Sequence, residues 1–165
     1  MKAFDRKLVL EDGSEYPGYG FGASCERICE VVFNTSMTGY QELASDPSYT
    51  DQFVVMTYPL AGNVGINDLD FESAGVQPAA VVVSELCELP SNWQMKKSLD
   101  EYMDEQGVCG MYGVDTRALT RHIRMNGAMR GVIAEEEEAA SVGVIASDVI
   151  MEATCKEAYA VSEEG

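Results

Sequence analysis

The stretch KLVLEDGSEY at residues 7–16 decides how the fold begins, because an Asp-Gly pair follows a run of alternating residues. Asp-Gly is the strongest short sequence signal for a tight turn between two antiparallel strands. The stretch therefore predicts a β-hairpin whose turn lies near Asp12 and Gly13.

Four further segments have the composition of β-strands. They are rich in β-branched or apolar residues and are bounded by residues that favour turns. These segments are residues 30–33, 52–57, 79–83 and 108–111. Strands are thus expected to dominate the first half of the fold.

Helical patterns come later in the sequence. Residues 98–101 read SLDE, a capping box, and residues with helical spacing follow until Gly107, so a helix is expected between them. A second helix is expected from an Asp115 N-cap to Asn126-Gly127, with basic residues near its end that complement the helix dipole.

The last part of the sequence has a weaker pattern. The acidic run at 135–138 fits the first turn of a helix over 139–146, and the segment 148–156 fits another short helix. Taken with the earlier segments, the order is mostly strands first and helices later. That order favours an α+β or layered β/β/α domain over a regular doubly wound sheet.

The overall composition indicates one compact, soluble domain. A chain of 165 residues with 46% apolar and 24% charged residues falls within the range of single globular domains. Its longest apolar run, residues 79–83, is far shorter than a bilayer span, and charges within residues 2–7 interrupt any signal peptide. We expect a cytoplasmic protein with no membrane partner.

The net charge and the cysteine content exclude some classes of partner and cofactor. With 28 acidic and 11 basic residues the net charge is −17, which disfavours a nucleic-acid partner but suits a basic protein surface. The cysteines contain no CxxC pair, which argues against a disulfide framework and a zinc site. They are Cys25, Cys29, Cys87, Cys109 and Cys155. We expect reduced, mostly buried thiols and no bound metal.

Polar residues and glycines are dense between the predicted strands, in residues 33–42, 46–49 and 58–67. Short polar side chains satisfy backbone groups in loops, and glycine permits positive φ angles. Composition alone leaves two interpretations open, a structured turn region and a binding site.

The amino-acid sequences of these loops resemble those of a known family. The segments FNTSMTGYQE (33–42), DPSYTDQ (46–52), TYPxxGNxGxN (57–67), PSNW (90–93) and GVDTRALTRHIR (113–124) resemble, in the same order and with nearly the same spacing, signature segments of the carbamoyl-phosphate synthetase small subunit. The resemblance extends from about residue 8 to 133. It implies an N-terminal domain, residues 1–134, with a layered swivelling β/β/α fold. Residues 135–165 would form an acidic, partly helical segment leading toward a glutamine amidotransferase domain that this chain lacks.

The resemblance also implies an activity. In the family, the small subunit hydrolyses glutamine and passes ammonia to a large subunit, which makes carbamoyl phosphate from bicarbonate with ATP and magnesium for arginine and pyrimidine synthesis. The nucleophilic cysteine, with its His and Glu, belongs to the amidotransferase domain. We therefore expect this chain alone to be inactive, with no catalytic residue and no cofactor of its own.

One substrate contact is implied by the resemblance. Ser48 matches a family serine that helps to bind glutamine across the cleft from the amidotransferase domain, and its hydroxyl can both donate and accept hydrogen bonds. Taken without the resemblance, Ser48 is a turn residue after proline. The expected partners are the large subunit, the chain's own amidotransferase domain and glutamine.

Three alternatives remain open at the level of sequence. Cys109 and His122 would form a nucleophile and base if the chain were a free-standing thiol hydrolase, although a buried cysteine and a helix-end histidine explain them as well. The second alternative is an acidic interaction module unrelated to glutamine. Separately, Arg117, Arg121 and Arg124 either pair with carboxylates across an interface or form a solvated helix end.

Overall fold

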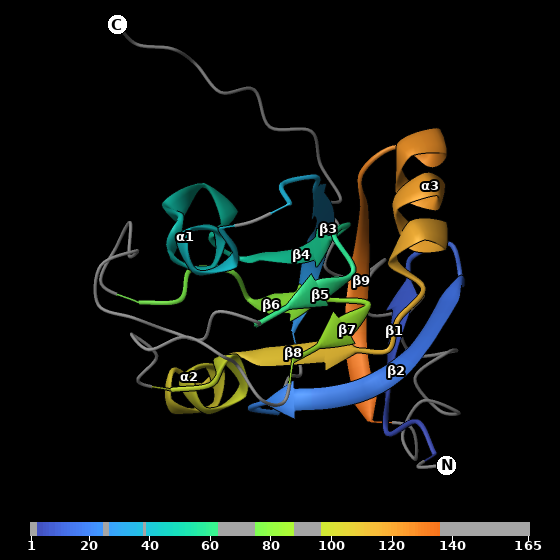
Figure 1. The fold of residues 1–165 in the computed structure, drawn as a ribbon. Coiled ribbons are helices and arrows are strands. Elements are labelled where there is room, and N and C mark those ends of the chain that lie inside the picture. The colour runs from blue at the N-terminus through green and yellow to red at the C-terminus, as the bar shows by residue number, and fades with distance from the viewer. Residues whose placement is uncertain (1–2, 25–26, 38, 63–74, 88–96, 136–165) are drawn as a thin grey trace, which may run out of the picture.

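A closed barrel forms the centre of the molecule (Figure 1). The computed structural model describes residues 3–24, 27–37, 39–62, 75–87 and 97–135. The barrel strands follow one another around the barrel in the order β1-β2-β8-β6-β4-β3-β9, and β9 pairs with β1 to close it. Their bounds are β1 (Arg6–Leu10), β2 (Glu15–Gly22), β3 (Ile28–Asn34), β4 (Gln52–Met56), β6 (Ala80–Val82), β8 (Cys109–Tyr112) and β9 (Met129–Glu135).

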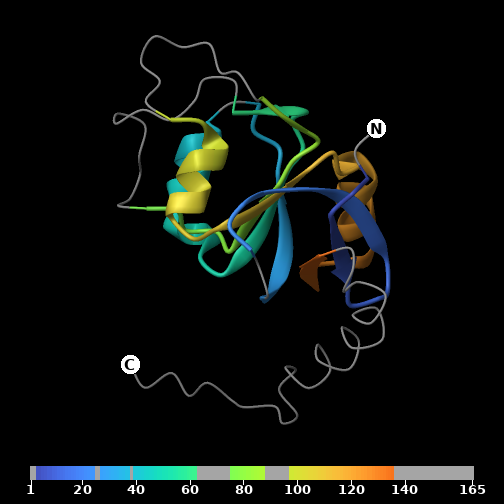
Figure 2. The same ribbon diagram turned by 90° about the horizontal axis from the view of Figure 1, so that it is seen from below.

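Helices flank the barrel on two sides. The helix α1 (Tyr40–Ser45) and the helix α2 (Leu99–Glu105) lie on one side, and α3 (Thr116–Asn126) lies on the other, as Figure 2 shows from below. A one-turn 3-10 helix, η1 (Pro47–Tyr49), follows α1. The short strands β5 (Leu60–Ala61) and β7 (Glu85–Leu86) pair with each other in parallel, outside the barrel.

The barrel has a parallel half and an antiparallel half. Strands β3, β4, β6 and β8 run parallel, and every other neighbouring pair in the barrel is antiparallel. Parallel neighbours need long crossover connections, which here carry α1 between β3 and β4 and α2 between β6 and β8. The parallel half therefore gathers the carboxyl ends of four strands at one rim of the barrel.

The predicted hairpin is confirmed. Strands β1 and β2 pair in antiparallel register, with Val9 opposite Glu15. The Leu10 backbone N–H donates to the Ser14 carbonyl at 2.9 Å, and Gly13, with a φ of 84°, donates back to the Leu10 carbonyl at 2.9 Å. The side chain of Asp12 also accepts from the Ser14 N–H at 2.9 Å. The turn is thus fixed by the residues that predicted it.

Strand β4 shows how the core is divided. Phe53 and Val55 belong to one buried cluster, which includes Leu119 of α3, while Val54 belongs to a second cluster, which includes Met103 of α2. Successive side chains of a strand point to opposite faces, so β4 is buried on both. This explains why its sequence is a continuous apolar run.

Both predicted helices are confirmed with their caps. The Ser98 hydroxyl accepts from the Glu101 N–H at 3.2 Å, and the Glu101 carboxylate accepts from the Ser98 N–H at 3.0 Å. The Asp115 carboxylate accepts from the Ala118 N–H at 2.9 Å. The α+β class is confirmed at the level of a mixed helix and sheet fold, whereas the specific layered swivelling type stays a prediction.

The expected order of strands first and helices later is wrong in two places. Helix α1 lies between β3 and β4, and β9 follows α3. The six residues of α1 are too few to show helical periodicity, and its N-cap is Gly39, which makes no side-chain capping bond. The segments predicted within residues 136–165 lie outside the described residues.

Candidate functional site

Ser48 lies in η1 with its backbone fixed and its hydroxyl open. The Asp46 carboxylate accepts from the Ser48 N–H at 2.8 Å, Pro47 fixes the first position of the turn, and the Thr50 N–H donates to the Pro47 carbonyl at 3.2 Å. The Ser48 side chain is exposed, and no hydrogen bond to another described residue holds its hydroxyl. The turn therefore presents a hydroxyl that can donate to, or accept from, an outside ligand.

Asn34 joins three of the polar segments. As the last residue of β3, it donates from Nδ2 to the Tyr49 hydroxyl at 2.9 Å, and its Oδ1 accepts from the Ser36 N–H at 2.7 Å. Its carbonyl accepts from the N–H and the hydroxyl of Thr57 at 3.0 and 3.1 Å. Segments that are 15 and 23 residues from Asn34 in sequence thus meet at one end of the parallel strands.

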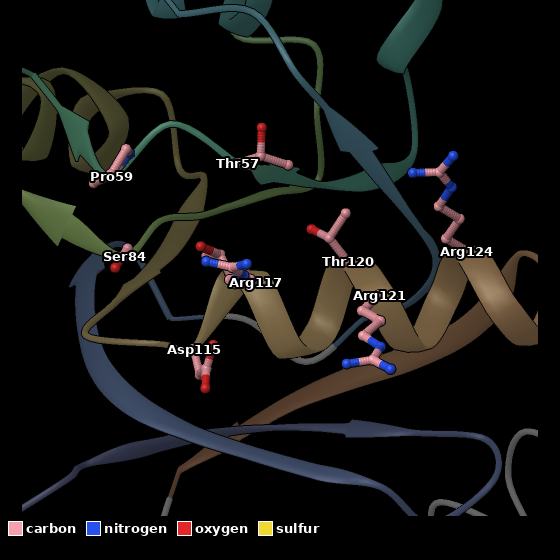
Figure 3. A pocket seen from close by; sticks show the side chains of 9 residues that line it. Thr57, Pro59, Ser84, Asp115, Arg117, Thr120, Arg121 and Arg124 are labelled. Atoms are coloured by element: carbon pink, nitrogen blue, oxygen red, sulfur yellow. The ribbon is translucent and has the colours of Figure 1, made fainter.

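Helix α3 forms one wall of a groove at the same rim. Thr57 follows β4, Ser84 follows β6, and the Gly113 N–H after β8 donates to the Ser84 carbonyl at 2.9 Å, so the start of α3 is held beside them. The α3 groove has a cavity volume of about 440 Å³. We define it by Thr57, Pro59, Ser84, Asp115, Thr116, Arg117, Thr120, Arg121 and Arg124, most of which are drawn in Figure 3.

The α3 groove contains residues that the sequence did not single out. The motif at 113–124 contains the three arginines and the segment 57–67 contains Thr57, but no motif in the sequence includes Ser84. The sequence does contain a signal for Ser84, because this residue comes directly after the apolar strand predicted at 79–83. Residues at this position lie at the carboxyl ends of the parallel strands. Ser48 lies outside the residues that line the α3 groove.

A serine, a histidine and an aspartate also meet at the hairpin turn. His122 Nε2 lies 2.5 Å from Asp12 Oδ2 and 3.4 Å from the Ser14 hydroxyl. A hydrolytic triad needs the carboxylate on one ring nitrogen and the nucleophile on the other, whereas here both contact the same nitrogen. The other ring nitrogen, Nδ1, lies 3.5 Å from Asn126 Nδ2. The contact therefore ties α3 to the hairpin and does not form a hydrolytic site.

The charge state of Asp12 follows from the same contacts. Partial burial raises the pKa of its carboxyl, but hydrogen bonds from Ser14 and His122, with the charge of His122, outweigh that effect and lower the pKa overall. Burial, together with the carboxylates of Asp12 and Asp115, raises the pKa of the neighbouring Tyr16 hydroxyl. Asp12 is thus held in its ionised form.

The Cys109 and His122 pair considered from the sequence does not form. Cys109 is 1% exposed in the barrel core, and its Sγ lies 3.8 Å from the Ala79 carbonyl oxygen. His122 makes its polar contacts with Asp12, Ser14 and Asn126. The interpretation of Cys109 as a small buried hydrophobe is the one that the structure supports.

The described part of the chain offers no cluster of three or more His, Cys, Asp or Glu side chains able to hold a metal ion. Cys25, one of the cysteines considered for a zinc site, lies outside the described residues. Among the described helices, none has the length and apolar character needed to cross a membrane.

Comparisons with known proteins point to one family. The family model for the carbamoyl-phosphate synthase small chain, CPSase domain, matches residues 8–133. The chain is 58% identical to the small chain of Maridesulfovibrio salexigens over 137 residues, covering 83% of this chain and 36% of that one. It is 46% identical to the small chain of Syntrophotalea carbinolica, and this match covers 96% of this chain and 44% of that one.

A third relative carries a narrower name. The pyrimidine-specific small chain of Bacillus subtilis is 52% identical, over 81% of this chain and 36% of that one. The chain spans roughly a third to under half of the length of these relatives. Among solved structures, an aminopeptidase from Aneurinibacillus sp. strain AM-1 is 16% identical, with a TM-score of 0.43. The match covers 81% of this chain and 31% of the aminopeptidase.

Proposed function

Because the chain belongs to the carbamoyl-phosphate synthase small-chain family, we propose that it is the non-catalytic N-terminal domain of the small subunit of a glutamine-dependent carbamoyl-phosphate synthase. In the complete enzyme the small subunit hydrolyses glutamine and delivers ammonia to the large subunit. The large subunit then uses ATP and magnesium to make carbamoyl phosphate from bicarbonate, for arginine and pyrimidine synthesis in the cytoplasm. The specific swivelling β/β/α architecture belongs to this proposal.

The family match to residues 8–133 carries the proposal. It begins in β1 and ends in β9, so it covers a folded unit and not an isolated segment. The relatives are far longer than this chain, which supports a role as one domain of a larger enzyme. Release of ammonia close to its point of use has a physical reason, since ammonia in neutral water becomes protonated and loses its nucleophilic lone pair.

We propose that Ser48 contacts the amino-acid head group of glutamine. Its open hydroxyl and fixed backbone support this role. The remaining glutamine contacts and the thiol nucleophile would come from an amidotransferase domain. A single exposed hydroxyl cannot hold a small molecule tightly in water, so the 165-residue chain should bind glutamine negligibly.

The alternatives now have less support. A free-standing thiol hydrolase needs Cys109 and His122 together, and they lie apart, with Cys109 buried. An acidic interaction module unrelated to glutamine metabolism is disfavoured by the family match. The acidic surface instead suits a basic face on the large subunit or on the amidotransferase domain.

Two measurements on the purified chain test the proposal. We expect no ammonia release from glutamine above the background set by Cys109→Ala, and we expect the chain to comigrate with the large subunit in size-exclusion chromatography. Ammonia release by the chain alone would refute its non-catalytic role. Failure to comigrate at micromolar concentrations would refute the assembly with the large subunit.

A further inference from the structure

Three cations on α3 have no acidic partner within the part of the chain that the structure describes. Arg117, Arg121 and Arg124 are exposed, and no ion pair among the described residues includes them. By contrast, Arg6 pairs with Glu135 and Lys97 with Glu105. On a chain with 28 acidic and 11 basic residues, a surplus of carboxylates could pair with these arginines. The fold instead leaves them open on one helix.

The spacing of these arginines puts them along one wall. Positions 117, 121 and 124 are four and three residues apart, so they share a face of α3 and span about 10 Å of its length. All three line the α3 groove. In Figure 3 the guanidinium of Arg117 points toward Ser84 and Arg124 extends from the far end of the helix, whereas Arg121 points in this view away from Thr57 and Ser84.

The rest of the α3 groove adds hydrogen-bond donors. The Thr120 hydroxyl is buried without a partner among the described residues and points in Figure 3 toward the space between Thr57 and Ser84. A buried hydroxyl without a partner is uncommon and calls for an explanation. The carboxylate of Asp115 is engaged by the Ala118 N–H and points away from the Arg117 guanidinium. The groove therefore offers chiefly donors, as an anion requires.

The net charge selects the kind of anion. A chain of net charge −17 repels a polyanion such as nucleic acid at distances beyond the first few ångströms, where three arginines cannot compensate. A partner protein can have a basic or neutral surface overall and a few carboxylates at one point. Such a partner is attracted at long range by the acidic chain and at short range by the arginines of the groove. Planar guanidinium groups bind carboxylates through two parallel hydrogen bonds.

We propose that the α3 groove is the docking site for a carboxylate-bearing segment of the large subunit, with its acidic side chains against Arg117, Arg121 and Arg124. This inference rests on the proposed function, since it names the chemistry of the partner's face. It makes the groove, and not the Ser48 turn, the point of subunit recognition.

Charge reversal tests the site. The double variant Arg117→Glu/Arg121→Glu should raise the Kd for the large subunit by about tenfold or more, because it replaces attraction with repulsion. A matched control is Arg27→Glu together with Arg130→Glu, which makes the same change in net charge at positions that do not line the groove. Circular dichroism should show both double variants folded. Equal weakening by the two would refute the proposal in favour of a general charge effect.

Cross-linking tests the chemistry of the partner. Arg117→Lys and Arg121→Lys introduce amines that a carbodiimide joins to a carboxylate in direct contact, and mass spectrometry then identifies the joined Asp or Glu. We expect cross-links from positions 117 and 121 to the large subunit, and none from an Arg27→Lys control.

The outcomes separate the two proposals. If the unsubstituted chain fails to bind the large subunit, the proposed assembly fails and the groove's role fails with it. If the chain binds but the groove variants bind equally well, or the substituted positions form no cross-links, only the groove assignment is overturned. Saturable binding of inorganic phosphate at the groove, with subunit binding unchanged in the double variant, would assign the groove to a small anion and would likewise overturn it.

Discussion

Removal of the Arg6 guanidinium should strongly destabilise the barrel. Arg6 is 8% exposed, and its Nη1 donates to the carbonyls of Phe21 on β2 and Gly110 on β8, each at 3.1 Å. Its Nε donates to Glu135 on β9 at 3.2 Å. One side chain of β1 thus connects to three other strands, two of which, β2 and β9, are the neighbours of β1 in the closed barrel.

The size of the effect follows from these contacts. A hydrogen bond to a charged group contributes about 1.5–3 kcal/mol, and Arg6→Met removes two such bonds to buried carbonyls while it keeps most of the aliphatic stem. The half-exposed Glu135 adds at most about 1 kcal/mol. We expect a loss of about 3–7 kcal/mol from a total that is about 5–15 kcal/mol for typical domains. Arg6→Lys should lie between, because an ammonium lacks the planar fork.

Urea unfolding followed by circular dichroism measures this loss. Lys97→Met is the matched control, because it removes the cation of the ion pair between Lys97 and Glu105, whose side chains are both about half exposed. This substitution should lower the free energy of unfolding by less than about 1 kcal/mol. The slope of the unfolding transition should stay unchanged if only stability differs. A value for Arg6→Met within about 1 kcal/mol of the unsubstituted chain would refute the reasoning.

Further predictions concern the turns, the core and the site. Because the Ser48 side chain is exposed, Ser48→Ala should change the free energy of unfolding by less than about 0.5 kcal/mol. In a complete small subunit the same substitution should raise KM for glutamine, and an unchanged KM would count against the proposed role of Ser48. Asp12 has a pKa below its ordinary 3.8, so its contribution to stability is present above that value and is lost as pH falls through the lower folded pKa. Asp12→Asn should therefore lose less stability between about pH 5 and about pH 2 than the unsubstituted chain does in urea titrations. Gly110→Ala would place a Cβ 2.3 Å from the Phe21 ring and should lower the unfolding free energy by about 1–3 kcal/mol; an unchanged urea midpoint would contradict this. Cys109→Ala should leave hydrolysis of glutamine or esters at background, and a drop from measurable turnover would revive the thiol hydrolase.

Local signals predicted local structure well. The Asp12-Gly13 turn and the caps at Ser98 and Asp115 depend on contacts within a few residues, and each is present as the sequence indicates. The strand predictions within 30–33 and 52–57 also hold. For β4 the reason is that a strand buried on both faces requires an apolar run. Helix α1 was missed because so short a helix depends on packing and not on its own periodicity.

Strand β9 was missed for a different reason. Its residues 129–135 alternate between buried and partly exposed positions for most of their length. The buried positions include Gly131 and the partly exposed ones include Val132, so the sequence itself does not alternate between apolar and polar residues. The pairing of β9 with both β1 and β3 closes the barrel and joins positions that lie far apart in sequence, such as Arg6 with Glu135 and Val31 with Met129. Closure is a property of the whole sheet, so no local pattern expresses it.

The sequence by itself determined the family, the charge, the hairpin and the helix caps, because each depends on residue identity or on neighbours along the chain. Tertiary structure alone decided that Cys109 is buried away from His122, that Arg6 connects β1 to β2, β8 and β9, and that Ser84 lies beside the arginines of α3. These outcomes depend on which strands become neighbours. The pairing of strands is decided when the two core clusters are buried together. The spacing of these residues along the sequence therefore does not predict it.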